Sequence, residues 1–347
     1  SNPDPLSSDG PLKSLRPATI NHRRHQIQQM ASALVLAGHE ISQITSLAYI
    51  VDIENFKDGI RQLMSRFGDK PTEAVHGLTI GLKAIAAHYV KVDEDHHNEL
   101  KRICQRLNLE VDGLREKNQQ RLLQLEDPNN LAKLLHLPEK LVKLSKRSGL
   151  RDHKAALMVQ AALAIEILLY APMRINNLAS LDLEHHIRRI KIKREDRIQI
   201  YIPAPEVKND RALHYELGSQ TTALLDYYLQ KARPILLREP SDYLFPAQNG
   251  DKKRNTALSH LIKSMILEHT GLTINAHLFR SIAGKIHSLA APGDFVTLSH
   301  VIGDSLKTAM KSYAQFEQKN SLEHYQRSVD QARSQLIPGK TKRRKRS

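Results

Sequence analysis

The sequence holds few of the side chains that build covalent cross-links or metal sites. Its 347 residues include a single cysteine, Cys104, which lies in a stretch with a helical pattern. One cysteine cannot form an internal disulfide, and it excludes any zinc site made of several cysteines. The sequence also has no cluster of carboxylates or of Cys and His that is typical of a metal site. We therefore expect a buried, inert thiol, no metal ion and no cofactor.

Long uninterrupted apolar runs are lacking as well. The most apolar stretch, residues 155–173, is interrupted by Gln160 and Glu166 and stopped by Pro172. This pattern predicts a buried helix and not a membrane span. The first residues are polar and rich in Pro and Ser, so we expect no signal peptide and no membrane partner.

Acidic residues are outnumbered by basic ones. The chain carries 52 Lys and Arg against 37 Asp and Glu, which gives a formal net charge of +15. This balance favours a polyanionic partner, with nucleic acid first and an anionic membrane second. The length predicts two domains, and the hydrophobic content of 40% is typical of a globular protein.

The first half of the sequence has a helical pattern. Residues 1–16 are rich in Pro and Ser and predict a disordered leader. Residues 17–126 show apolar positions three or four apart and no strand pattern, which predicts a helical domain. Arg23 and Arg24 lie on the polar face of its first helix and are candidates for DNA binding. Further helices are expected at about 42–51, 54–67, 71–90 and 94–108.

Residues 127–149 are predicted to be a basic linker. The segment opens with a turn-forming cluster, Asp127–Asn130, and continues with many lysines and leucines. Lys143 and Lys146 are candidate contacts to DNA. Two interpretations stay open, a solvated helix face and a positively charged connector that wraps a partner.

The second domain, residues 150–336, is expected to combine helices with a small sheet. Isoleucines alternate with polar residues at 187–192 and at 198–202, and residues 212–217 form a third short segment. This period of two predicts three antiparallel strands. Helices are expected at about 220–233, 254–269, 277–290, 294–302, 305–316 and 320–335, and residues 337–347 form a basic tail. The fold class is thus mainly α with a small three-stranded antiparallel sheet.

Four features of this domain are candidates for a functional site, and their order along the sequence is more informative than any one of them. Arg174 lies at the junction of two helices, and Lys208 lies in a polar turn between the second and third strands. His277 and Arg280 are three residues apart near a helix start, where free amide groups favour anions. Tyr313 follows in a short polar helix. Each feature alone also fits ordinary packing or a solvated surface, but the series Arg, Lys, His-x-x-Arg, Tyr is distinctive.

This series resembles the tyrosine recombinase, or phage integrase, family. Leu168–Leu183, reading LLYAPMRINNLASLDL, is similar to the first arginine box of the family, and His277–Arg280 is similar to its second box. Leu298–Ala314, reading LSHVIGDSLKTAMKSYA, is similar to the segment that ends at the nucleophile. The resemblance covers about residues 150–320, and residues 17–126 match the core-binding domain of the family in size and position. It implies that the two domains form a clamp around DNA.

The resemblance also implies a mechanism. Tyr313 would attack the DNA phosphate and form a 3′-phosphotyrosyl link, while Arg174 and Arg280 hold the nonbridging oxygens. His277 would accept a proton or bind the phosphate, and Lys208 would protonate the leaving 5′-oxygen. Neither metal nor ATP would be needed. The resemblance further implies site-specific recombination such as integration of a mobile genetic element, carried out by a homo-tetramer on two double-stranded DNA sites. We expect a cytoplasmic, nucleoid-associated protein of prokaryotic or phage type.

One position departs from the family pattern. The family usually has a histidine, or sometimes a tryptophan, nine residues before its tyrosine, whereas this chain has Asp304. An ionised aspartate cannot donate a hydrogen bond to a phosphate and repels it. Either Asp304 orients a neighbour such as His300, or cleavage is slow or regulated. Three alternatives therefore stay open: a catalytically weakened DNA-binding protein of the same fold, a type IB topoisomerase, and a structural helical protein with a basic tail.

Overall fold

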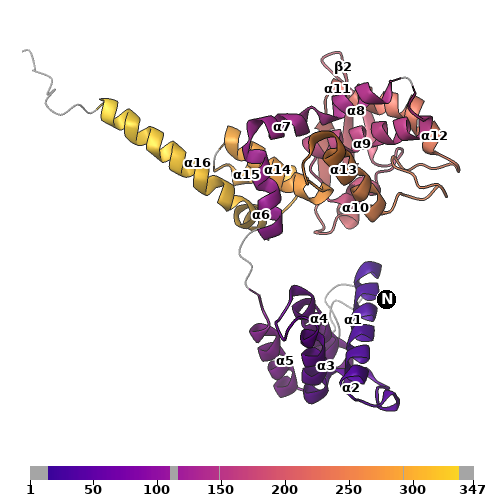
Figure 1. Cartoon of the computed structure of the whole chain (residues 1–347), viewed down its shortest axis with the longest axis vertical. Helices are drawn as coiled ribbons and strands as arrows, with labels where there is room; N and C mark the ends of the chain where they lie inside the picture. The colour runs from indigo at the N-terminus through magenta and orange to yellow at the C-terminus, as the bar shows by residue number, and fades with distance from the viewer. Residues whose placement is uncertain (1–14, 110–115, 148, 292, 336–347) are drawn as a thin grey trace, which may run out of the picture. The chain divides into compact units, whose positions relative to one another are not determined.

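The structure is a computed structural model that describes residues 15–109, 116–147, 149–291 and 293–335. Within its last helix, the side chains of 311–321, 323 and 324 lie outside the described part. The chain forms two compact units, Ser1–Val111 and Asp112–Ser347 (Figure 1). Most of the predicted leader and the whole predicted tail lie outside the described residues.

Unit 1 (Ser1–Val111) is helical throughout its described part, as the periodicity predicts. Four of its helices begin at a capping side chain that accepts a hydrogen bond from a backbone N–H of the first turn. The four caps are Ser46, Asp52, Thr72 and Asp93. Its elements are α1 (Pro17–Leu36), η1 (Ile41–Gln43), α2 (Leu47–Val51), α3 (Ile53–Ser65), α4 (Glu73–Ile85), η2 (Ala86–Val90) and α5 (Glu94–Arg106).

The core of unit 1 depends on a close approach of α1 and α3. Met30 and Leu34 of α1 are fully buried, and Phe56 of α3 packs in the same cluster. A Cβ atom at Gly59 would lie 2.5 Å from Cε of Met30, so a larger residue would force the buried Met30 side chain to move.

Unit 2 (Asp112–Ser347) begins earlier than the sequence pattern suggests. Its first elements are α6 (Glu116–Leu123), η3 (Gln124–Glu126), α7 (Pro128–Leu135) and α8 (Leu137–Ser145). The prediction that the first domain extends to residue 126 is therefore wrong, as is the prediction of a linker at 127–149. The physical reason is burial, because Leu125, Leu134 and Leu141 are almost fully inaccessible and belong to the core of unit 2. The linker prediction followed the lysines, which occupy the opposite, exposed face of α8.

The centre of unit 2 is α9 (Asp152–Tyr170), which packs against α8 and α13 (Asn255–Thr270) (Figure 1). By length and composition α9 could cross a membrane, yet 67% of its apolar window is buried inside the protein. The prediction of a buried helix is confirmed. Its one fully buried polar side chain, Gln160, donates a hydrogen bond to the hydroxyl of Tyr228, which in turn donates to the carbonyl of Leu244. These bonds satisfy Nε2 of Gln160 and the hydroxyl of Tyr228, which would otherwise be costly to bury, whereas Oε1 of Gln160 has no partner among the described residues.

The predicted three-stranded antiparallel sheet is confirmed. Its strands are β1 (Ile187–Ile192), β2 (Glu195–Ile202) and β3 (Leu213–Leu217), in the order β1-β2-β3. Ile200 pairs with Ile187 on one side and with Tyr215 on the other, which places the alternating apolar residues on the core face.

The remaining helices continue from the sheet to the end of unit 2. They are α11 (Ser219–Tyr227), η5 (Tyr228–Ala232), α12 (Arg233–Leu236), η6 (Ala276–Leu278), α14 (Phe279–Ala290), α15 (Phe295–Ile302) and α16 (Leu306–Gln335), while α10 (Ile175–Ala179) and η4 (Ala204–Glu206) come earlier. The two helices expected at 305–316 and 320–335 form the single helix α16, because no glycine or proline interrupts the segment.

Candidate active site

Arg174 is held at the junction between α9 and α10. It is the N-cap residue of α10, and its carbonyl accepts the N–H of Asn177 at 2.8 Å. The preceding residue, Met173, is fully buried and fixes the chain on the core. The guanidinium group of Arg174 is thereby presented at the edge of the core, with its side chain 23% exposed.

Arg280 reaches the same region from α14. Asn275 caps the preceding turn, since its side-chain oxygen accepts the N–H groups of His277 and Leu278. Arg280 follows in the first turn of α14, and its side chain is only 8% exposed. An arginine so deeply buried needs partners, and it donates to the carbonyl of Ile302 and to Asp304.

The turn between α15 and α16 places Asp304 opposite these arginines. Gly303 has a φ of 59°, the left-handed conformation that ends many helices. The N–H of Gly303 bonds to the carbonyl of His300 at 3.1 Å, and the N–H of Asp304 bonds to that of Ser299 at 2.9 Å. A Cβ atom at position 303 would also lie 2.2 Å from Cδ2 of Leu213, so a larger residue would force the Leu213 side chain to shift.

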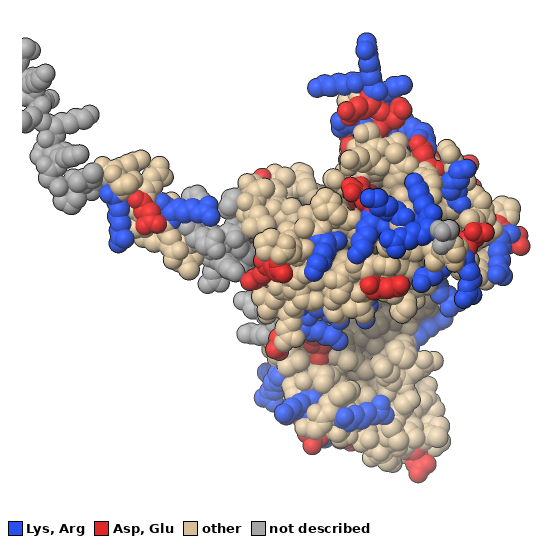
Figure 2. Space-filling model, turned by 45° about the horizontal axis from the view of Figure 1, so that its top comes forward, with Lys and Arg blue, Asp and Glu red and all other residues tan. Residues whose placement is uncertain are grey.

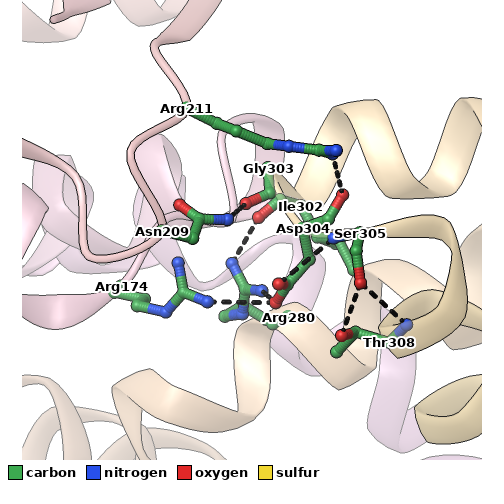
Figure 3. A network of polar contacts seen from close by, with 9 residues as sticks. All are labelled: Arg174, Asn209, Arg211, Arg280, Ile302, Gly303, Asp304, Ser305 and Thr308. Carbon is green, nitrogen blue, oxygen red and sulfur yellow. Dashed lines mark hydrogen bonds and ion pairs between the residues drawn. The ribbon is translucent and has the colours of Figure 1, made fainter. Parts of the chain in front are cut away.

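The carboxylate of Asp304 lies between the two guanidinium groups (Figure 3). Its Oδ2 atom accepts from Nη2 of Arg174 at 3.0 Å and from Nη2 of Arg280. The hypothesis that Asp304 orients His300 is wrong, because no hydrogen bond joins these two described residues and His300 is exposed. The reason is the turn at Gly303, which breaks the helical register that would have aligned residues 300 and 304.

Two residues that the sequence did not single out connect this turn to the loop that carries Lys208. Asn209 donates to the carbonyl of Gly303 at 2.8 Å, and Arg211 donates to the carbonyl of Asp304 at 3.0 Å (Figure 3). Val207 is fully buried, while Lys208 is exposed. Lys208 lies in the turn between β2 and β3, as predicted. Its loop is held on both sides of this residue, because Val207 is buried and Asn209 is hydrogen-bonded to Gly303. The polar run around Lys208 was the available signal for Asn209 and Arg211.

His277 and Tyr313 complete the predicted set. His277 lies in η6 and is exposed, whereas Arg280 is buried in the helix that follows, so the two do not share one continuous helical face. Tyr313 lies within α16, and its side chain falls outside the described residues. The structure thus brings together Arg174, Arg280 and Asp304, and it ties the Lys208 loop to them.

Tyr215 of β3 is a further buried group near the arginines that sequence reasoning missed. Burial raises the pKa of its phenol to about 12, although the charges of Arg280 and Arg174 act in the opposite direction. Its hydroxyl finds no hydrogen-bond partner within the described part of the chain. Only the alternation of β3 indicated that Tyr215 faces inward.

Among the residues predicted to contact DNA, Arg24, Lys143 and Lys146 are exposed and Arg23 is half-buried. Figure 2 shows many Lys and Arg side chains on the protein surface, with Asp and Glu among them. In unit 1, the guanidinium carbon of Arg23 lies 6.0 Å from the ring centre of Tyr89, and Arg24 is exposed. In unit 2, Lys143 and Lys146 line a groove of about 850 Å³ between α8 and α11. Nζ of Lys146 lies 4.8 Å from the ring centre of Tyr227 in this groove. Part of the basic surface of α8 therefore flanks an apolar groove.

Comparison with solved structures finds several chains to which this chain is similar, and the first one below shares its fold. A lambda integrase fragment, solved as a dimer bound to a COC′ core site, is 12% identical, with 88% of this chain and 89% of that chain covered and a TM-score of 0.51. The recombinase XerH, solved with a palindromic difH substrate after cleavage, is 14% identical over 91% of this chain and 98% of that one, with a TM-score of 0.46. The integrase from mycobacterium phage Brujita is 14% identical over 87% and 85%, with a TM-score of 0.33. No curated protein sequence matches the chain.

The sequence model of the Phage integrase family matches residues 127–317, which is more than half of the chain. The match contains Arg174, Lys208 and Arg280, and it begins at the N-cap of α7, in the segment that belongs to unit 2. The buried Arg280 and the half-buried Arg174 converge on one anionic group, which fits an enzyme that binds a phosphate. The chain therefore belongs to the Phage integrase family and is a tyrosine recombinase that breaks and rejoins DNA.

Proposed function

We propose that Tyr313 is the nucleophile and that Arg174 and Arg280 hold the scissile phosphate. The observation that carries this assignment is the convergence of both guanidinium groups on one oxygen, Oδ2 of Asp304. The guanidinium group of arginine binds carboxylate and phosphate oxygens in proteins. A phosphodiester has two nonbridging oxygens that share one negative charge, as the two oxygens of the Asp304 carboxylate do. The arginine pair is therefore suited to bind a phosphodiester.

The reaction balances without an external energy source. The phenolic oxygen of Tyr313 forms a bond to phosphorus, and the bond from phosphorus to the 5′-oxygen of the DNA breaks. One phosphodiester replaces another, so the reverse attack by a 5′-hydroxyl rejoins the strand. The extra charge on the nonbridging oxygens in the transition state is stabilised by the two arginines, each worth several kcal/mol in such sites.

Proton transfer falls to His277 and Lys208. A phenol with a pKa near ~10 is mostly protonated at neutral pH, so it needs an acceptor such as the imidazole of His277. The leaving 5′-oxygen needs a proton in return. Lys208 can deliver one because its ammonium is mobile and exposed on a loop tied to the arginine site.

Double-stranded DNA is the substrate that this chemistry requires, and the basic side chains of both units support it. Arg23, Arg24, Lys143 and Lys146 would add phosphate contacts, with the two units acting as a clamp. We further propose a homo-tetramer on two DNA sites. Exchange of both strands between two duplexes needs four cleavages, and each copy of the chain supplies one Tyr313.

A suicide substrate tests the nucleophile. A duplex from the flanks of the protein's own gene, nicked near the cleavage position, releases a short strand on cleavage and traps the covalent adduct. We expect adducts with the unmodified chain and none with Tyr313→Phe. Tyr325→Phe is the matched control, because Tyr325 lies in the same helix and is 67% exposed. Adducts that persist with Tyr313→Phe and vanish with Tyr325→Phe would assign the nucleophile elsewhere.

A second function is favoured by one observation, the carboxylate of Asp304 at the place a phosphate would take. If this carboxylate blocks the arginines permanently, the chain is a catalytically weakened DNA-binding protein of the same fold. The adduct assay separates the two functions, because this second one predicts DNA binding with no adduct from the unmodified chain.

A further inference from the structure

The turn that carries Asp304 uses both terminal nitrogens of Arg280. Nη1 donates to the carbonyl of Ile302 and Nη2 donates to the carboxylate of Asp304. Nη2 of Arg174 donates to the same carboxylate oxygen. The groups assigned above to the phosphate are thus engaged by the protein itself, in a site where Asp304 is 14% exposed.

A phosphate and the carboxylate cannot both occupy this position. Each is an anion that needs the same guanidinium donors, and two anions in contact in a partly buried site repel each other strongly. Binding of the scissile phosphate therefore requires the carboxylate to leave.

The main chain of the turn is anchored independently of that carboxylate. The N–H of Asp304 bonds to Ser299, its carbonyl accepts from Arg211, and the carbonyl of Gly303 accepts from Asn209.

Apart from its bonds to the arginines, the side chain of Asp304 is held only by a long hydrogen bond, in which Oδ1 accepts from the N–H of Ser305 at 3.3 Å, among the contacts of the described residues. The side chain is therefore the part of the turn that can move once this bond breaks. Rotation about its side-chain bonds would release Nη2 of Arg174 and Nη2 of Arg280. The turn, the Lys208 loop bonded to it, and the bond from Nη1 of Arg280 to the carbonyl of Ile302 would stay in place.

We propose that Asp304 is a positioning residue that acts as an internal substitute for the phosphate. This inference rests on the proposed function of the arginine pair. Without DNA, the carboxylate holds two like-charged guanidinium groups together in the arrangement that binds a phosphate. When DNA binds, the scissile phosphate displaces the carboxylate. Displacement of the carboxylate costs free energy and therefore weakens DNA binding. Only a phosphate that other contacts already hold beside the arginines can replace the carboxylate.

The test measures DNA affinity in chains that cannot react. Tyr313→Phe serves as the parent, and Asp304→Asn is added to it, because asparagine keeps the shape and one acceptor oxygen but removes the charge. Affinity for a random duplex is measured by fluorescence anisotropy over a range of salt concentrations. We expect affinity to rise about tenfold at low salt, as for an anion removed from contact with the arginine pair. The slope of log K against log salt should steepen by about 0.9, because one more DNA phosphate is neutralised by the protein.

A matched control separates this local effect from a general change in charge. Asp226→Asn makes the same change in net charge and frees another arginine, Arg189, which pairs with Asp226 outside the site. We expect its effect on the slope to be clearly smaller. Equal slopes for Asp226→Asn and Asp304→Asn would overturn the proposal, as would weaker DNA binding by a folded Asp304→Asn chain.

Inorganic phosphate gives a second readout that a merely structural role would not move. Asp304→Asn should melt at a lower temperature than its parent, because two arginines lose their counter-charge. Phosphate should then raise the Tm of Asp304→Asn more than that of the parent, since the vacated site binds it. Equal rises in both chains would contradict the proposal. Adduct formation by chains with Tyr313 intact is scored separately, so loss of the proposed function and loss of this inference give different results.

Discussion

Arg24 of unit 1 and Arg280 of unit 2 differ in exposure and in hydrogen bonding. In unit 1, Arg24 is exposed on α1, and the other face of this helix packs into the core of unit 1. In unit 2, Arg280 is 8% exposed, and its guanidinium is bonded to the carbonyl of Ile302 and to Asp304. An exposed arginine contributes charge with little constraint on geometry, whereas a buried and bonded one has a fixed direction. Unit 1 is therefore suited to holding DNA, and unit 2 is suited to stabilising charge at one atom.

The largest expected effect tests whether the units are separate in stability as well as in structure. Phe56 is fully buried in the core of unit 1, so Phe56→Ala should cost roughly 3–5 kcal/mol. Unit 1 should melt at a lower temperature while the transition of unit 2 stays in place, as measured by scanning calorimetry. The control is Phe67→Ala, because Phe67 is 53% exposed in the same unit. A single transition that moves as a whole would show that the two cores are coupled.

The next effect concerns geometry at Arg280. Arg280→Lys keeps the charge but loses the fork that reaches both the carbonyl of Ile302 and Asp304. Adduct formation on the suicide substrate should fall about 100-fold or more, while DNA affinity changes little. Arg189→Lys, at an exposed pair on the sheet, should leave the rate within about twofold. A parallel loss of affinity and rate for Arg280→Lys would place its role in holding DNA.

The opposite pattern is expected in unit 1. Arg24→Ala should weaken DNA binding a few-fold and reduce the salt slope by about 0.9, the share of one phosphate contact. Cleavage by the bound complex should be unchanged, because Arg24 belongs to a different unit from the arginine pair. Anisotropy over a salt series and single-turnover cleavage measure the two quantities. A lower cleavage rate at saturating DNA would contradict the division of roles.

The smallest expected effect concerns the stability contributed by Glu166. Its carboxylate accepts a hydrogen bond from a threonine, whereas that of Asp304 accepts from arginines. Glu166 of α9 accepts a hydrogen bond from Thr221 at 3.1 Å, and burial raises its pKa above the ordinary value of 4.5. A raised pKa in the folded state means that the protonated form is favoured there, so its stabilising contribution is present below pH 4.5 and lost as the pH rises.

Glu166→Gln should therefore raise the Tm by ~1–2 °C at pH 7, because the amide stays neutral and can still accept from Thr221. The difference should shrink below pH 4.5, where Glu166 is itself protonated. Thermal melts at the two pH values measure it. A gain that is independent of pH would show that the charge of Glu166 is not its cause.

Much of the fold follows from local patterns. The period of the apolar residues indicated the helices of unit 1, and the alternation of isoleucines predicted the three strands with errors of at most three residues. The buried helix α9 was predictable because Gln160 and Glu166 interrupt its apolar run. These features depend on neighbours within a few residues, which the sequence displays directly.

The unit boundary and the role of residues 127–149 did not follow in this way. The lysines of α7 and α8 are exposed and led to the linker prediction, although leucines are more numerous in both helices and several of them bind the segment to unit 2. Whether such leucines face the first core or the second is decided by packing partners far away in the sequence, such as α9 and α13.

By itself, the sequence determined most of the helices and the three strands, the anomaly at Asp304, and the order of Arg174, Lys208, His277, Arg280 and Tyr313. Only the tertiary structure decided that Asp304 lies between the two arginines, and that Asn209 and Arg211 hold its turn. The reason is that these contacts join segments about 100 residues apart. They arise because the cores of α9, α14 and the sheet fix where each segment ends, and no periodicity within one segment records the position of another.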